Sequence, residues 1–122
     1  MEDKRKTLLW LDDYRNPFDA EINWLVFSPL PLDNLHVVWV RTYQQFCATI
    51  EQDGVPDAVC LDHDLGEESE GYSGFDAAKF LVNYCIDYRK PIPLFNSQSA
   101  NPVGRENILS YLKQAKEIIN VF

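Results

Sequence analysis

The chain has 122 residues, of which 46% are hydrophobic and 25% are charged, and this composition is typical of one globular domain rather than a disordered segment. Nineteen acidic residues against eleven basic ones give a net charge of −8, and no long basic cluster is present, which argues against extended binding along a nucleic-acid backbone. No apolar run approaches the ~20 residues that span a bilayer, and no signal-peptide core follows the charged N-terminus, so we expect a cytoplasmic protein with no membrane segment.

The first third of the chain predicts two buried strands joined by an irregular segment. Residues 7–11 and 36–40 are continuous apolar runs, the pattern of strands covered on both faces in a parallel sheet. Between them, residues 13–34 carry Pro17, Pro29 and Pro31 around one short apolar stretch. We predict a long ordered loop here, with at most one helical turn, in place of a crossover helix.

The middle of the chain predicts a helix, a strand and a second helix. Apolar residues recur at three- and four-residue intervals over residues 43–50, and a turn signal follows at residues 54–56. Residues 58–61 form another continuous apolar run, which predicts a third strand. Helical spacing returns over residues 75–85.

The last third predicts a strand over residues 92–95 and a long helix. Asn101 is a favourable N-cap and Pro102 suits the first helical position, so this helix is expected to begin there and to run to about Ile119. Strands that alternate with helices are typical of an α/β domain with a mostly parallel sheet. We predict one such domain over residues 1–122.

The three cysteines indicate a reducing compartment. Cys47, Cys60 and Cys85 show no metal-binding spacing, and each lies in a predicted helix or strand among apolar neighbours. We interpret them as small buried hydrophobic residues.

Two acidic clusters directly follow predicted strands. Asp12 and Asp13 follow the first strand, and Asp62, His63 and Asp64 follow the third. The carboxyl ends of parallel strands meet at one edge of a sheet, where neighbouring carboxylates repel one another unless a cation or protons intervene. This placement predicts a site for a hard divalent cation. The alternative is that these acids cap loops and helices in solvent.

A polar stretch follows the fourth predicted strand at the same edge. Ser97, Ser99 and Arg105, together with the backbone N–H groups of the helix that Asn101 caps, could hold a phosphate group. The alternative is an ordinary capped helix with Arg105 on its surface. With the acidic clusters, this stretch favours metal-assisted chemistry on a phosphate ester, in which His63 serves as general acid or base.

Four segments of the chain resemble the cyclic-phosphate processing receiver-like family. They are the sequences LDDYRNP at 11–17, VRT at 40–42, LDHDLG at 61–66 and NPVGREN at 101–107. The resemblance implies a three-layer, receiver-like (flavodoxin-like) α/β domain with a reduced four-stranded sheet. It implies Mg²⁺ or Mn²⁺ at Asp12, Asp13 and Asp62, phosphate contacts from Arg15, Arg41 and Arg105, and catalytic roles for Asp62, His63 and Asp64. The implied function is phosphoesterase chemistry on a cyclic phosphate, at a nucleotide or RNA terminus.

The chain also differs from signalling receivers and from relatives in this family. No fifth strand with a lysine follows, and Gln98 stands where relatives often carry a histidine before the serine-containing stretch. The missing lysine argues against a phosphorylation-driven switch, and without that histidine the domain could bind a phosphorylated ligand without turning it over. A second hypothesis therefore stands beside the enzymatic one. In it the domain is a non-enzymatic receiver-like module that binds a metal or a partner protein, or that accepts phosphate on Asp62.

Overall fold

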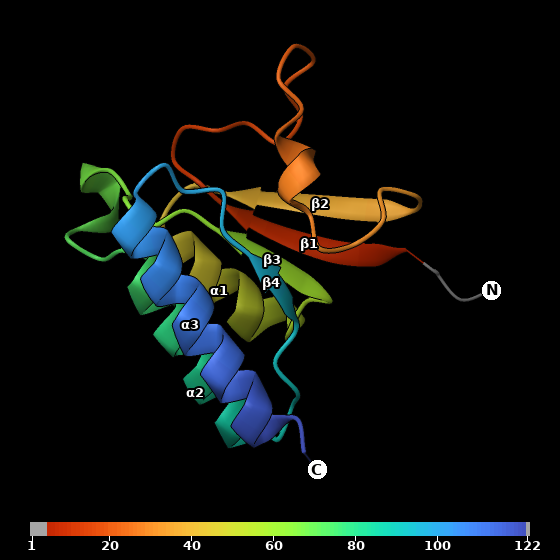
Figure 1. Ribbon diagram of the computed structural model, residues 1–122, viewed down its shortest axis with the longest axis vertical. Helices are drawn as coiled ribbons and strands as arrows, with labels where there is room; N and C mark the ends of the chain where they lie inside the picture. Colours follow the sequence, from red (N-terminus) through yellow and green to blue (C-terminus); the bar gives the residue numbers. More distant parts are fainter. Residues whose placement is uncertain (1–4, 122) are drawn as a thin grey trace.

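A parallel four-stranded sheet with strand order β2-β1-β3-β4 forms the centre of the computed structural model, which describes residues 5–121 (Figure 1). The remaining ends of the predicted domain, residues 1–4 and 122, lie outside the described part. The strands are β1 (Lys6–Leu11), β2 (Leu35–Val40), β3 (Ala58–Leu61) and β4 (Leu94–Asn96), and the helices are α1 (Tyr43–Asp53), α2 (Gly74–Tyr88) and α3 (Pro102–Ile119). Two short 3-10 turns, η1 (Trp24–Phe27) and η2 (Glu67–Ser69), lie in the connections.

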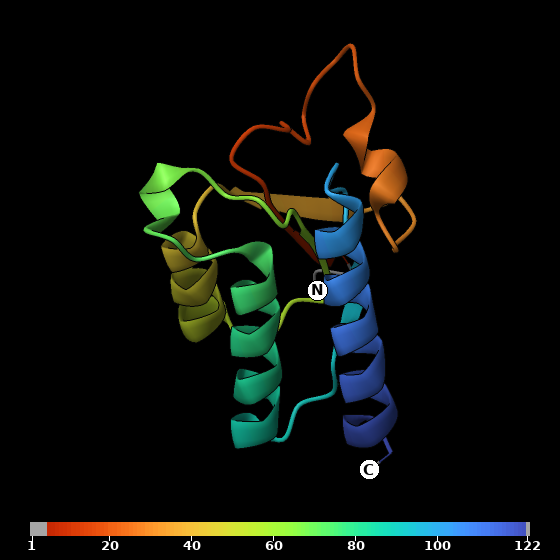
Figure 2. The ribbon, with the colours of Figure 1, turned by 60° about the vertical axis from the view of Figure 1, so that its left-hand side comes forward.

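All three α-helices cover one face of the sheet (Figure 2). Because side chains alternate along a strand, Leu9 and Leu11 of β1 point to this face, where they pack with Phe46 of α1, Leu81 of α2 and Ile108 of α3. These five side chains are at most 1% exposed. This face therefore holds the larger core of the domain.

The segment between β1 and β2 covers the other face. Leu8, Trp10, Ala58 and Cys60 point to this side and pack against residues of η1 and its flanks. The predicted loop with one helical turn is confirmed. This segment supplies the third layer of the predicted three-layer arrangement without a crossover helix.

The predicted start of the fourth strand is wrong by two residues and its predicted end by one. Pro93 has no N–H, and the N–H of Ile92 donates to Oδ1 of Asn120 at 2.7 Å, so neither residue donates to β3. The first inter-strand bond comes from Leu94, whose N–H donates to the carbonyl oxygen of Asp57 at 3.2 Å. The strand therefore begins at Leu94 and extends to Asn96.

Side-chain caps begin the three helices near the carboxyl edge of the sheet. Thr42 caps α1, Ser73 forms a reciprocal capping box with Asp76 at the start of α2, and Asn101 caps α3 with Pro102 in its first turn, as predicted. Between residues 5 and 121, no helix is long and apolar enough to cross a membrane. The ends of β1, β3 and β4 and the start of α3 thus meet at one edge, which carries the candidate site.

Candidate metal and phosphate site

Three carboxylates converge at this edge, as the sequence predicts. One oxygen from each of Asp12, Asp13 and Asp62 lies within 4.8 Å of the others. Asp12 is fully buried, Asp62 is 4% exposed and Asp13 is half-buried. Carboxylate oxygens are the ligands that Mg²⁺ and Mn²⁺ prefer, so this donor set fits a hard divalent cation.

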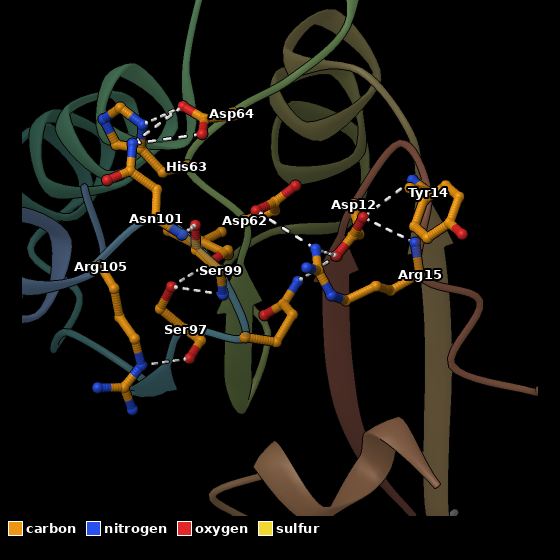
Figure 3. Close-up of polar contacts among 12 residues, drawn as sticks. Asp12, Tyr14, Arg15, Asp62, His63, Asp64, Ser97, Ser99, Asn101 and Arg105 are labelled. Carbon is orange, nitrogen blue, oxygen red and sulfur yellow. Dashed lines mark hydrogen bonds and ion pairs between the residues drawn. The ribbon is translucent and has the colours of Figure 1, made fainter. Parts of the chain in front are cut away.

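Asp12 is already bound by several protein donors. Its Oδ1 accepts the backbone N–H groups of Tyr14 and Arg15 at 2.9 and 2.8 Å, which folds the chain into a tight turn (Figure 3). Its Oδ2 accepts Nε2 of Gln98 at 3.2 Å and lies 3.5 Å from Nη1 of Arg15. Asp13 and Asp62 are therefore better placed than Asp12 to bind a cation directly.

The surroundings of Asp62 disfavour the ionised form of its carboxyl group. Burial raises the pKa of its carboxyl to about 6, and the neighbouring charge of Asp12 adds to this effect. Arg15, whose Nη1 lies 3.8 Å from Oδ1 of Asp62, and a hydrogen bond with Ser99 act in the opposite direction. A bound cation would favour the ionised form of this group.

Two arginines reach the cluster and each lies over an indole ring. The guanidinium carbon of Arg15 is 5.2 Å from the ring centroid of Trp24, and that of Arg41 is 5.1 Å from the ring centroid of Trp39. Nη2 of Arg41 also donates to the carbonyl oxygen of Asp13 at 2.9 Å. The structure thus brings two of the three predicted phosphate-binding arginines, Arg15 and Arg41, to the cluster of Asp12, Asp13 and Asp62.

A hollow of about 310 Å³ opens beside Asp13 and Arg41, and the loop after β3 forms its other wall. A Cβ on Gly66 would lie 3.0 Å from Oδ2 of Asp13, so glycine leaves room for this carboxylate.

The loop after β3 is hydrogen-bonded to α1, because the buried Ser69 hydroxyl accepts the N–H of Tyr43 at 3.1 Å. The ring of Tyr72 stacks on that of Tyr43 with centroids 4.2 Å apart. Glu67 and Glu68 complete the lining of the hollow.

His63 and Asp64 form a pair at the start of α3. Nδ1 of His63 lies 2.8 Å from Oδ1 of Asp64, and Nδ2 of Asn101 donates to both oxygens of Asp64 at 3.3 Å. The hydrogen bond with His63 is the main cause that lowers the pKa of Asp64. Figure 3 shows this pair on the α3 side of Asp62, away from Asp12.

The serines and the arginine that follow β4 mainly hold their own loop together. Ser97 donates its hydroxyl to the carbonyl oxygen of Leu61 at 2.6 Å, and the Ser99 hydroxyl accepts the N–H of Asn101 at 3.1 Å. Nε of Arg105 donates to the carbonyl oxygen of Ser97 at 2.9 Å. Its guanidinium points away from Asp62 (Figure 3). Of the predicted phosphate contacts in this stretch, Ser99 is bonded to Asp62 and Asn101 to Asp64.

Several residues that shape the site are given no role in it by the sequence-based prediction. Gln98 is 3% exposed and donates to the carbonyl oxygen of Leu11 at 3.0 Å as well as to Asp12, while its Oε1 has no hydrogen-bond partner among residues 5–121. A Cβ on Gly104 would lie 2.3 Å from Cγ of His63, and one on Gly74 would lie 1.7 Å from the carbonyl oxygen of Asp62. The glycines in the first turns of α2 and α3 are the sequence signal from which this close approach to the loop after β3 could have been predicted.

Comparison with known proteins gives one family match over most of the chain. A family model described as the cyclic-phosphate processing Receiver domain matches residues 7–114. No curated protein matches the sequence.

Solved structures share the fold at low identity. The crystal structure of the phosphorylated cyanobacterial phytochrome response regulator RcpA is 19% identical with a TM-score of 0.56, over 94% of this chain and 89% of that one. A fusion with a trimeric coiled-coil segment of yeast Spc42 is 17% identical with a TM-score of 0.57, over 98% of this chain and 82% of that one. These likenesses confirm the predicted receiver-like, flavodoxin-like α/β fold.

Proposed function

Because the chain belongs to the cyclic-phosphate processing receiver domain family, we propose that it is a metal-dependent phosphoesterase that opens a cyclic phosphate at a nucleotide or RNA terminus. The observation that carries the proposal is the convergence of Asp12, Asp13 and Asp62 within 4.8 Å, with Arg15 and Arg41 beside them. Carboxylates to hold a cation and guanidinium groups to bind phosphate oxygens are the two parts that such chemistry needs.

The acidic cluster is the proposed cofactor site. Asp13 and Asp62 would hold Mg²⁺ or Mn²⁺, with Asp12 as the buried residue that fixes the turn behind them. When bound, the cation supplies charge neutralisation and polarises a phosphoryl oxygen. Arg15 and Arg41 then neutralise the remaining negative charge of the phosphate, and the planar guanidinium can contact two oxygens at once.

His63 is the proposed proton carrier. When its Nδ1–H donates to Asp64, the other ring nitrogen carries a lone pair that can accept a proton, as a general base must. In the hydrolysis of a cyclic phosphate, water adds to phosphorus, one phosphorus–oxygen ester bond breaks, and the leaving oxygen takes up a proton. Asp64, fixed by Asn101, would orient the imidazole for these transfers.

The proposed RNA substrate binds to the protein through the end of the RNA that carries the cyclic phosphate. With a net charge of −8, the chain is expected to bind an RNA through the metal site and a few arginines rather than along the phosphate backbone. The three cysteines are free, which agrees with the proposed cytoplasmic location.

A ³¹P NMR assay with a 2′,3′-cyclic nucleotide and Mg²⁺ tests the proposal directly. The wild-type protein is expected to convert the cyclic signal into that of a monoester, and Asp62→Ala is expected to lose this activity. Asp87→Ala removes an exposed carboxylate from α2 and serves as the control that should remain active. Equal turnover by the wild type and Asp62→Ala would contradict the assignment.

A phosphate-accepting receiver module is the second candidate. The observation that favours it is the fold shared with a phosphorylated response regulator, together with a buried aspartate at the end of β3. In this case Asp62 would take a phosphoryl group from a small donor and hold it as an acyl phosphate. Intact mass after treatment with acetyl phosphate distinguishes the candidates, because only the receiver module gains one phosphoryl group that Asp62→Ala cannot gain.

A further inference from the structure

Arg15 makes three contacts besides the ion pairs of its guanidinium with Asp12 and Asp62. Its N–H donates to Oδ1 of Asp12 at 2.8 Å, and its carbonyl oxygen accepts Nε1 of Trp10 at 2.9 Å. Its guanidinium lies over the ring of Trp24, with the guanidinium carbon 5.2 Å from the centroid. The side chain is only 16% exposed, so little of the guanidinium is free to sample solvent.

The carboxylates alone do not fix the direction of this side chain. Nη1 of Arg15 lies 3.5 Å from Asp12 and 3.8 Å from Asp62, at and beyond the limit of a hydrogen bond, so these ion pairs are poorly directional. An aromatic ring below the guanidinium constrains its plane, while its edge N–H groups remain available to oxygen acceptors.

Trp24 is itself anchored to the sheet. It is the first residue of η1 and packs on the cluster that contains Leu8, Trp10 and Cys60. At the other end of this turn, the carbonyl oxygen of Phe27 accepts Nδ2 of Asn96 at 2.9 Å. The turn thus connects the sheet to the site through the indole ring of Trp24.

We propose that Trp24 is a positioning residue for phosphate binding. Its indole ring holds the guanidinium of Arg15 beside Asp12 and Asp62, so that the free N–H groups face an incoming phosphate oxygen. The segment between β1 and β2 is then part of the phosphate site as well as the third layer of the fold. This inference rests on the proposed function, because it assigns Arg15 to phosphate.

Binding of inorganic phosphate in the presence of saturating Mn²⁺ tests this role. Trp24→Leu is expected to weaken phosphate binding by about ten-fold, the loss of a partly desolvated cation–π contact, while Mn²⁺ affinity stays within about two-fold. Trp24→Phe keeps an aromatic face and should restore most of the affinity. Val26→Ala, on an exposed residue of the same turn, is the matched control and should bind phosphate like the wild type.

A double-mutant cycle separates positioning from a general loss of structure. Arg15→Gln removes the guanidinium and its charge, so it should weaken phosphate binding, and adding Trp24→Leu to it should have little further effect. Additive losses would overturn the role of Trp24, as would unchanged phosphate binding by Trp24→Leu.

A ligand-free signal checks the contact itself. The Nε–H proton of Arg15 should be shifted upfield in NMR by the Trp24 ring in the wild type and in Trp24→Phe, and this shift should disappear in Trp24→Leu. If the Nε–H proton of Arg15 has the same chemical shift in the wild type and in Trp24→Leu, the two side chains are not in contact and the inference is overturned. This result would count whether or not Trp24→Leu folds as well as the wild type. Wild-type protein that binds Mn²⁺ but no phosphate would overturn the proposed function, and with it this role.

Discussion

Asp12 and Asp62 are buried carboxylates at the ends of neighbouring strands, yet their surroundings differ. Asp12 accepts two backbone N–H groups and the amide of Gln98, so its charge is well compensated. Asp62 has Ser99 and a more distant Arg15, and burial raises its pKa to about 6. We therefore expect Asp12 to stabilise the fold, and the ionised carboxylate of Asp62 to destabilise it until a ligand compensates its charge.

Asp62→Asn should therefore stabilise the metal-free protein at neutral pH. The pKa of Asp62 is about 6 in the folded state against 3.8 ordinarily, so its ionised form disfavours folding, and its contribution to stability falls as the pH rises from about 4 through 6. In EDTA at pH 7.5, denaturation by urea should show a gain of roughly 1–2 kcal/mol for the variant. The gain should shrink at pH 5. A variant that is less stable than the wild type at both pH values would contradict this expectation.

Asp12→Ala and Asp13→Ala should affect different properties. Removing Asp12 leaves the N–H groups of Tyr14 and Arg15 and the amide of Gln98 without their acceptor, which should lower the free energy of unfolding by about 2–3 kcal/mol. Asp13 is half-buried, and its removal should change stability by less than about 1 kcal/mol while weakening metal binding. Urea unfolding compares the two variants, and equal losses of stability would contradict the structural role of Asp12.

At the scale of the elements, α2 and α3 both begin in contact with the loop after β3. The first residue of α2, Gly74, donates its N–H to the carbonyl oxygen of His63 at 2.8 Å, and Gly104 of α3 lies against the imidazole of His63. Asn101 accepts the N–H of Gly104 at 3.0 Å while its amide binds Asp64. The starts of α2 and α3 thus fix the position of His63.

Gly104→Ala tests this packing. Alanine favours helix by about 1 kcal/mol over glycine in a helix interior, but its Cβ would lie 2.3 Å from Cγ of His63. We expect the ring to be displaced, with a net loss of about 1–3 kcal/mol and a changed His63 signal in NMR. Val103→Ala changes an exposed neighbour in the same turn and should leave the His63 signal unchanged. A more stable variant with an unchanged His63 signal would contradict the packing argument.

Apolar spacing and turn residues in the sequence predict most of the strands and helices. The exact ends of some of these elements depend instead on contacts with residues far away in the sequence. The strands β1 to β3 and all three helices follow from apolar spacing and turn residues. The start of β4 does not, because it depends on Pro93 and on a hydrogen bond between Ile92 and Asn120 far along the chain. The third layer was predicted as a loop, but its packing on Trp10 and Cys60 requires knowledge of the sheet.

At the scale of the whole molecule, a parallel sheet brings together residues that are far apart in sequence. Asp12, Asp13 and Asp62 could be predicted as a cluster, because strand ends share one edge. The bond between Gln98 and Asp12 spans 86 positions and has no local signature. The orientation of Arg105 toward Ser97 likewise follows from the course of one loop, which spacing alone does not predict.

The charge of the whole molecule predicts how an RNA would bind. We expect affinity for an oligonucleotide with a 2′,3′-cyclic phosphate end to depend weakly on salt, with a slope of log K against log[salt] no steeper than about −2, because few phosphates are contacted. Affinity should also change little as the oligonucleotide is lengthened. Fluorescence anisotropy at several salt concentrations measures both, and a steep slope that grows with length would indicate binding along the backbone instead.

The central claim is that the carboxyl edge of the sheet binds a divalent cation, and calorimetric titration of metal-stripped protein with Mg²⁺ and Mn²⁺ tests it most directly. The wild type is expected to bind one ion, Asp62→Ala is expected to bind none, and Asp87→Ala should bind like the wild type. Absence of binding to either ion by the folded wild-type protein, or equal binding by Asp62→Ala, would contradict the claim.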